Sequence, residues 1–158
     1  MAVTVIFAVN PCIAFTAPAS GSGLPALSLP NLQNKIVNIP DFYGKPLILA
    51  FFASWSKSCA DEVLFLDGIY GKYKSKGIKI VGISFDKKTE SLENFITKNN
   101  VSFDLLIDKK LKSINKYAIL IIPTTMLINK EGKIENTFVD FDDNTKKSII
   151  DFVESQGK

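Results

Sequence analysis

The sequence contains no histidine and no arginine, and these two absences exclude several kinds of active site. Without histidine, neither Ser-His-Asp nor Cys-His catalysis is available, and a common zinc ligand is missing. Without arginine, the chain has no guanidinium group for bidentate recognition of phosphate or carboxylate. The available chemistry therefore rests on cysteine, carboxylates, lysine, hydroxyls and the backbone, and we expect no metal and no cofactor.

All 19 basic residues are lysines, and the formal net charge is only +3. The lysines are scattered along the chain, and no basic stripe with interleaved aromatic residues is present. This pattern predicts a solvated lysine-rich surface and no binding of nucleic acid. A length of 158 residues with 46% hydrophobic residues fits one globular domain with a sizeable core, which we expect to be a monomer.

The segment 1–23 differs in composition from the rest of the chain. An apolar stretch at 3–9 is followed by small residues, as in the core and end of a secretory signal, but basic leading residues are missing. Two interpretations stay open, a signal or membrane-anchor remnant or a flexible arm, so the protein is either exported (periplasmic or membrane-associated) or cytoplasmic. Cys12 is a poor match for a lipid-attachment cysteine. Residues 19–25 have the composition of a flexible linker.

From residue 24 onward, strand and helix patterns alternate, which predicts an α/β fold with a mixed central sheet and helices on both faces. Thr89 is the expected cap of one helix, and Gly132 is expected to take a positive φ in a hairpin turn. The expected strands are 26–29, 35–39, 47–52, 78–85, 103–107, 124–128 and 133–138, and the expected helices are 58–73, 89–100, 111–117 and 145–154.

The most informative motif is the run from Trp55 to Cys59. An apolar segment of strand length precedes it, and a segment with helical spacing follows it. A thiol at this junction lies on the first turn of a helix, where free N–H groups and the helix dipole favour the thiolate. The positive charge of Lys57 also favours the thiolate. Burial against the strand disfavours the thiolate, and we expect burial to dominate and to raise the pKa of Cys59.

From residue 24 to the end, the chain resembles the TlpA/ResA-type thiol–disulfide oxidoreductases, in the AhpC/TSA branch of the thioredoxin superfamily. The matching features occur in the order expected for that family. They are an opening hairpin and turn at 27–46, the strand into the active site at 49–55, an acidic residue at Glu62, a cis-proline loop at 122–125 and a hairpin at 127–134. The resemblance implies a thioredoxin-like fold with an inserted helix and strand at 87–119.

The family mechanism uses two cysteines, of which the first attacks a partner disulfide and the second resolves the mixed disulfide. By this resemblance, Ser56 stands at the attacking position and Cys59 at the resolving position, so half of the dithiol is missing. The implied partner is a protein thiol or disulfide held beside the cis-proline. The candidate catalytic residues are Ser56, Cys59 and Glu62, and the candidate partner-binding residues are Trp55, Ile122, Pro123 and Thr124.

Three functions stay open at this stage. The first is a redox domain with a single thiol, or an inactive one, that still binds its partner. The second is a peroxidase in which Cys59 attacks peroxide. The motif of such peroxidases has a proline where this chain has Phe52, and the arginine that they use is absent here. The third is a non-catalytic module that binds an extended peptide. Glu62 has two interpretations, a partner of the helix dipole or, by the family resemblance, a proton shuttle for Cys59.

Overall fold

The computed structural model describes residues 18–156 of the chain. The expectations for the segment 1–17, including the signal and Cys12, lie outside these residues. The strands are β1 (Ser28–Pro30), β2 (Ile36–Asn38), β3 (Leu47–Phe52), β4 (Lys79–Ser84), β5 (Asp104–Ile107), β6 (Thr124–Ile128) and β7 (Ile134–Val139). The helices are α1 (Lys57–Tyr73), α2 (Thr89–Asn99), α3 (Lys112–Tyr117) and α4 (Asp143–Gln156), with short 3-10 turns η1 (Ile39–Phe42) and η2 (Lys74–Lys76). The predicted α/β class is confirmed.

Five strands form the central sheet in the order β5-β4-β3-β6-β7. β3 is parallel to β4, which is parallel to β5, whereas β6 runs antiparallel to both β3 and β7. The carboxyl ends of β3, β4 and β5 therefore meet at one edge of the sheet. Because Phe51 pairs with Thr124, β6 begins at this same edge. The loop before α1 and the loop before β6 are thus brought together.

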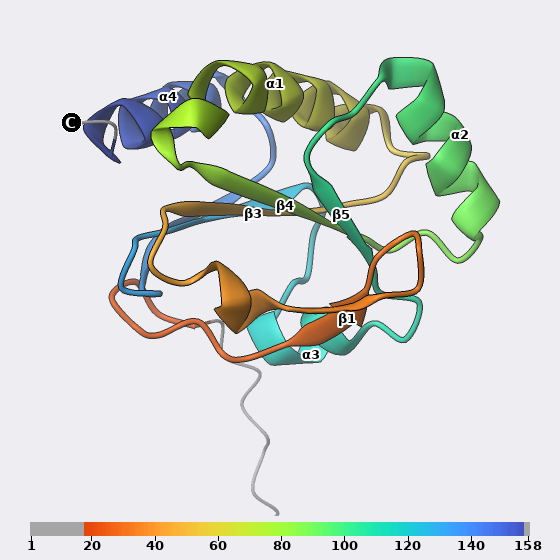
Figure 1. Cartoon of the computed structure of the whole chain (residues 1–158), viewed down its shortest axis with the longest axis horizontal. Coiled ribbons are helices and arrows are strands. Elements are labelled where there is room, and N and C mark those ends of the chain that lie inside the picture. Colours follow the sequence, from red (N-terminus) through yellow and green to blue (C-terminus); the bar gives the residue numbers. More distant parts are fainter. Residues whose placement is uncertain (1–17, 157–158) are drawn as a thin grey trace, which may run out of the picture.

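The sheet divides the core into two layers. Along β3, alternate residues face opposite sides, so that Ile48, Ala50 and Phe52 pack toward one layer and Leu49 and Phe51 toward the other. Helices α1 and α4 cover the first layer, and the opposite face carries α3, β1 and η1 (Figure 1). Every residue of β3 is buried, which explains its continuous apolar sequence.

Gly132 and Gly82 show two reasons for a glycine, a positive φ and a lack of room for a side chain. Gly132 has φ +75° in the turn between β6 and β7, as the sequence predicted. Gly82 lies in β4, where an added Cβ would come within 2.5 Å of Leu105. The sheet and the layer above it are therefore closely packed at β4 and β5.

Two local expectations are wrong. Residues 19–25 are not a free linker, because the amide of Gly21 donates to the carbonyl of Ile134 and the amide of Ile134 donates to the carbonyl of Ser22. Gly23 also bridges to Lys133, so this segment lies against the start of β7. Thr89 does not cap α2, since it is the first residue of the helix and follows the N-cap residue. Among residues 18–156, no helix is long and apolar enough to cross a membrane.

Candidate thiol site at the start of α1

Ser56 is the N-cap residue of α1. It has extended backbone angles (φ −89°, ψ 125°), and its hydroxyl oxygen accepts a 3.4 Å hydrogen bond from the amide of Cys59. Its carbonyl accepts the amide of Ala60 at 3.0 Å. A serine that precedes the first turn in this way is a preferred helix start, because it satisfies one of the free N–H groups. Ser56 therefore has a structural function at the position where the sequence suggested an attacking residue.

Cys59 has no exposed surface and lies in the core layer beneath α1. Desolvation by burial raises the pKa of its thiol, while the hydrogen bonds with Ser56 and the backbone of Ala53 lower it by less. The negative charges of Glu62 and Asp86 raise the pKa further. The expectation that burial dominates is confirmed in direction. The ammonium group of Lys57 pairs with Asp61 at 2.8 Å.

Glu62 lies one helical turn after Cys59 and is completely buried. Its Oε1 accepts a 2.5 Å hydrogen bond from the hydroxyl of Thr125 on β6. Its Oε2 has no hydrogen-bond partner among the described residues. Burial raises the pKa of Glu62 from 4.5 to about 7, with a lowering contribution from Thr125 and a raising one from Asp140. The carboxyl group of Glu62 is therefore buried between α1 and β6.

Asp86 fixes the loop that carries the motif, and the sequence analysis missed it. Its carboxyl group accepts hydrogen bonds from the amide of Ser54 at 2.9 Å, the hydroxyl of Ser54 at 2.7 Å and the hydroxyl of Ser84 at 2.6 Å. The side chain is 2% exposed. The link spans 32 residues of sequence, and only the position of Asp86 at the carboxyl end of a strand next to β3 would have indicated it.

The proline loop reaches the first turn of α1 through Asp140. The Ile122–Pro123 peptide bond is cis, as the sequence predicted. The carbonyl of Pro123 accepts the amide of Asp140 at 2.9 Å, and the carboxyl of Asp140 accepts the hydroxyl of Ser58 at 3.4 Å. Thr124 is buried, and its hydroxyl donates to the carbonyl of Ile121 at 2.6 Å. The hydroxyl is therefore used in a hydrogen bond inside the loop.

An apolar cavity of about 200 Å³ opens beside this loop. Trp55, Leu120 and Ile121 are exposed at the surface, with relative residue exposures of 75%, 78% and 59%. The full lining is Trp55, Phe85, Ile114, Ile119, Leu120, Ile121 and Ile122. The sequence analysis named Trp55 and Ile122 but missed Leu120 and Ile121. The apolar run that precedes Pro123 was the available signal, because it is too short for a buried helix and does not alternate like a half-exposed strand.

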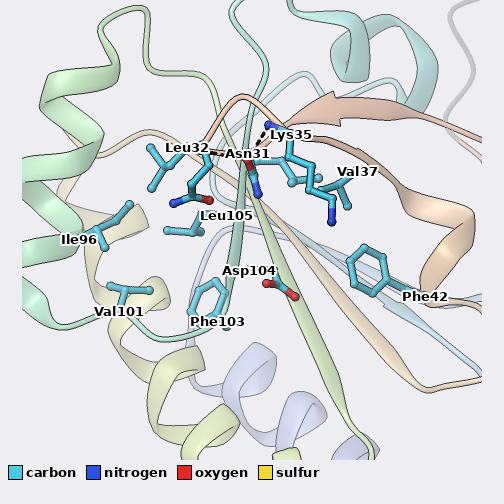
Figure 2. Close-up of a pocket in the computed structure, with 12 residues that line it drawn as sticks. Asn31, Leu32, Lys35, Val37, Phe42, Ile96, Val101, Phe103, Asp104 and Leu105 are labelled. Atoms are coloured by element: carbon cyan, nitrogen blue, oxygen red, sulfur yellow. Dashed lines mark hydrogen bonds between the residues drawn. The ribbon is translucent and has the colours of Figure 1, made fainter.

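A second cavity, of about 350 Å³, lies between the β1–β2 hairpin, α2 and β5. Figure 2 shows its lining, in which the side chain of Asn31 accepts hydrogen bonds from the amides of Gln33 and Lys35. Cys59, Ser56 and Pro123 are not among the lining residues. Over residues 18–156, no group of three or more cysteine and carboxylate side chains is placed to hold a metal ion. The chemistry of the site thus rests on one thiol, one buried carboxyl group and an apolar surface.

Residues 20–137 match the AhpC/TSA family. The thiol–disulfide oxidoreductase ResA of Bacillus thuringiensis is 32% identical over 114 residues, which cover 72% of this chain and 66% of that protein. This chain thus matches slightly less than two thirds of that relative's length.

Two solved structures show the same fold. One, from Chlorobium tepidum and assigned as the thiol:disulfide interchange protein DsbE, has a TM-score of 0.83 and 25% identity over 90% of this chain and all of that one. The other, the thioredoxin domain of a thiol–disulfide oxidoreductase from Bacteroides vulgatus, has a TM-score of 0.77 and 26% identity over 87% of this chain and 99% of that one. The fold described above is therefore thioredoxin-like.

Proposed function

The chain belongs to the AhpC/TSA family, and from that premise we propose that it is a thiol–disulfide exchange domain that holds a protein partner beside Pro123. The partner segment lies over the apolar surface of Trp55, Leu120 and Ile121, with its cysteine directed at the start of α1. Exposed aromatic and aliphatic side chains next to a cavity are typical of a protein-binding surface, because monomeric domains rarely leave such patches uncovered.

The observation that carries this proposal is the burial of Cys59 directly behind Ser56. A second cysteine of a dithiol pair is the shielded one, and Cys59 has no exposed surface. The residue three positions before it is the half-buried N-cap of the helix, and here it is a serine whose hydroxyl oxygen accepts the amide of Cys59. We infer that Ser56 occupies the place of the attacking thiol, so that this chain docks the partner but lacks the first thiol of the pair.

The chemistry left to Cys59 is a single half-reaction. When its thiolate attacks a partner disulfide, the partner's S–S bond breaks, a Cys59–partner S–S bond forms, and the other partner sulfur leaves as a thiolate and takes up a proton. Release of the partner requires a second thiol, and the only other cysteine of the sequence is Cys12. The hydroxyl of Ser56 does not substitute, because an unactivated serine is a weak nucleophile and the chain has no histidine base.

Glu62 is the proposed proton acceptor for Cys59. It lies on the same helix one turn away, its Oε2 has no partner among residues 18–156, and its pKa is raised to about 7. A carboxyl group with a pKa near neutrality both accepts and returns a proton at physiological pH. This arrangement supports the proton-shuttle interpretation over a purely electrostatic contribution to the helix.

The two alternative functions receive less support from the site. A peroxidatic cysteine needs access to peroxide and a stabilised thiolate, whereas Cys59 is buried and its pKa is raised. A purely non-catalytic peptide-binding module does not need a thiol below its groove or a carboxyl group with a shifted pKa beside it. Such a module would use the same apolar surface. It is therefore the function that we would assign if Cys59 proved to have no thiol chemistry.

We also place this function in an oxidising compartment, outside the cytoplasmic membrane. Disulfides persist in the periplasm and on cell surfaces and are rare in the cytosol. The apolar stretch at 3–9 is consistent with export. Fractionation of cells that carry the tagged full-length protein tests this placement, and recovery in the cytoplasm alone would contradict it.

The exchange function is tested by Ser56→Cys in a Cys12→Ala background, with reduction of insulin by dithiothreitol as the readout. We expect the variant to accelerate reduction and the parent to stay at the uncatalysed rate. Ser58→Cys is the matched control, because it adds a thiol to the same helical turn without restoring the spacing. Turnover by the parent contradicts the single-thiol account, and a folded but inactive Ser56→Cys variant favours the non-catalytic module.

A further inference from the structure

Five exposed lysines follow the carboxyl ends of β4 and β5. We call this group the lysine rim, and its members are Lys87, Lys88, Lys109, Lys110 and Lys112. The parallel arrangement of β3, β4 and β5 places these residues at the same edge of the sheet as the start of α1 (Figure 1). Five of the 19 lysines are thus gathered by the fold at the end of the sheet where α1 begins.

Within the described part of the chain, the acidic residues of the same two loops form no ion pair with the rim. Asp86 and Asp108 are 2% and 1% exposed, and both point inward. Asp86 accepts its hydrogen bonds from Ser54 and Ser84, and Asp108 accepts from the amides of Lys112 and Ser113 and from the hydroxyl of Ser113.

Among residues 18–156, no carboxylate lies within 4.0 Å of any of the five ammonium groups, since the ion pairs found there involve other lysines. The exposed acids nearby in sequence are Glu90 and Glu93 on α2, which leaves an excess of positive charge at the rim.

The lysine rim and the apolar cavity draw residues from the same two segments of the chain. Phe85, which lines the apolar cavity, comes two residues before Lys87, and Ile114, which also lines it, comes two residues after Lys112. On the other side, Lys109, Lys110 and Lys112 line a shallow cavity of about 290 Å³. A segment that crosses the apolar surface and continues past α3 would therefore pass directly over the lysines.

We propose that the lysine rim binds an acidic flank of the protein thiol partner, next to the partner's apolar segment and cysteine. This inference rests on the proposed function and names the class of partner, an acidic protein or a protein with Asp and Glu beside its reactive cysteine. Complementary charge at the edge of an interface accelerates association and selects among partners. Each exposed ion pair contributes little, so the selectivity comes from several lysines that act together.

An anionic membrane surface is the competing occupant of a lysine cluster. The position of the rim favours the protein partner, because the edge that carries it also carries Trp55 and Pro123. A membrane bound to this edge would cover the surface that the partner needs. Binding to vesicles therefore serves as an outcome that contradicts the inference.

The test uses three peptides that share a central apolar segment and a serine in place of the cysteine. Their flanks carry four aspartates, four glutamines or four lysines. Binding to the full chain is measured through the fluorescence of Trp55, the only tryptophan, at 50 and 200 mM salt. We expect the acidic peptide to bind about tenfold more tightly than the neutral one at low salt. This preference shrinks at 200 mM salt, because exposed charges are screened.

The charge-reversed variant Lys109→Glu/Lys110→Glu/Lys112→Glu should lose this preference and favour the basic peptide. Lys45→Glu/Lys130→Glu/Lys133→Glu is the matched control at the opposite edge of the sheet and should keep it. Equal binding of acidic and neutral peptides overturns the inference and leaves the proposed function standing. Binding of none of the peptides overturns both. Tight rim-dependent binding to phosphatidylglycerol vesicles that blocks the acidic peptide also overturns the inference, in favour of a membrane.

Discussion

Glu62 and Thr125 form a fully buried hydrogen bond of 2.5 Å that joins α1 to β6. One end of this link lies a helical turn after Cys59, and the other lies two residues after Pro123. The bond therefore couples the helix that carries the thiol to the strand that begins with the proline loop. Glu62 Oε2 has no partner among the described residues, so the stability of this link depends on whether the Glu62 carboxyl is protonated.

We expect Glu62 to make the protein less stable as the pH rises. Its pKa in the folded state is raised to about 7 from an ordinary value of 4.5. Between these two values, the folded chain binds a proton that the unfolded chain has lost, so the free energy of unfolding falls as pH increases. The total loss is about 3 kcal/mol and is complete above the folded-state pKa. Urea denaturation at pH 5 and pH 8 measures it.

Glu62→Gln should remove this component of the pH dependence, because the amide does not titrate. Glu93→Gln is the matched control on the exposed face of α2 and should leave the pH dependence of the parent unchanged. If the parent and Glu62→Gln lose equal stability between pH 5 and pH 8, the pKa of Glu62 is not raised and its assignment as proton acceptor is wrong.

Asp86→Ala should destabilise the fold by about 3 kcal/mol, because the Ser54 amide and the hydroxyls of Ser54 and Ser84 lose their acceptor. The loop before α1 should also loosen, so Cys59 should react faster with iodoacetamide. Asp104→Ala removes an exposed carboxyl from β5 and serves as the control. Equal unfolding free energies for Asp86→Ala and Asp104→Ala would show that the loop does not depend on Asp86.

The sequence predicted the central part of the fold well, because its signals are local. The bounds of β3 matched, since a continuous apolar run of six residues is typical of a fully buried strand. The helix after it, the burial of Cys59 and the cis bond before Pro123 also followed from the motif and the family resemblance. These features depend on residues that lie close together in the chain.

The features that the sequence did not predict depend on contacts between distant segments. The pairing of Gly21 and Ser22 with Ile134 is made by backbone groups, and a Gly/Ser-rich composition gives no indication of it. The acceptor role of Asp86 arises because β3 and β4 end side by side, 32 residues apart in sequence. The lysine rim likewise exists only after β4 and β5 are aligned.

The most direct measurement of the central claim is the rate at which Cys59 reacts with iodoacetamide as a function of pH, in a Cys12→Ala background. The account predicts a rate at pH 7 about a hundredfold below that of the unfolded chain, because a local opening of about 3 kcal/mol precedes reaction. The rate should rise only well above neutral pH, since burial raises the pKa of the thiol. A fast reaction at pH 7 that is independent of pH would reveal an exposed thiolate, contradict the shielded position of Cys59 and favour the peroxidase.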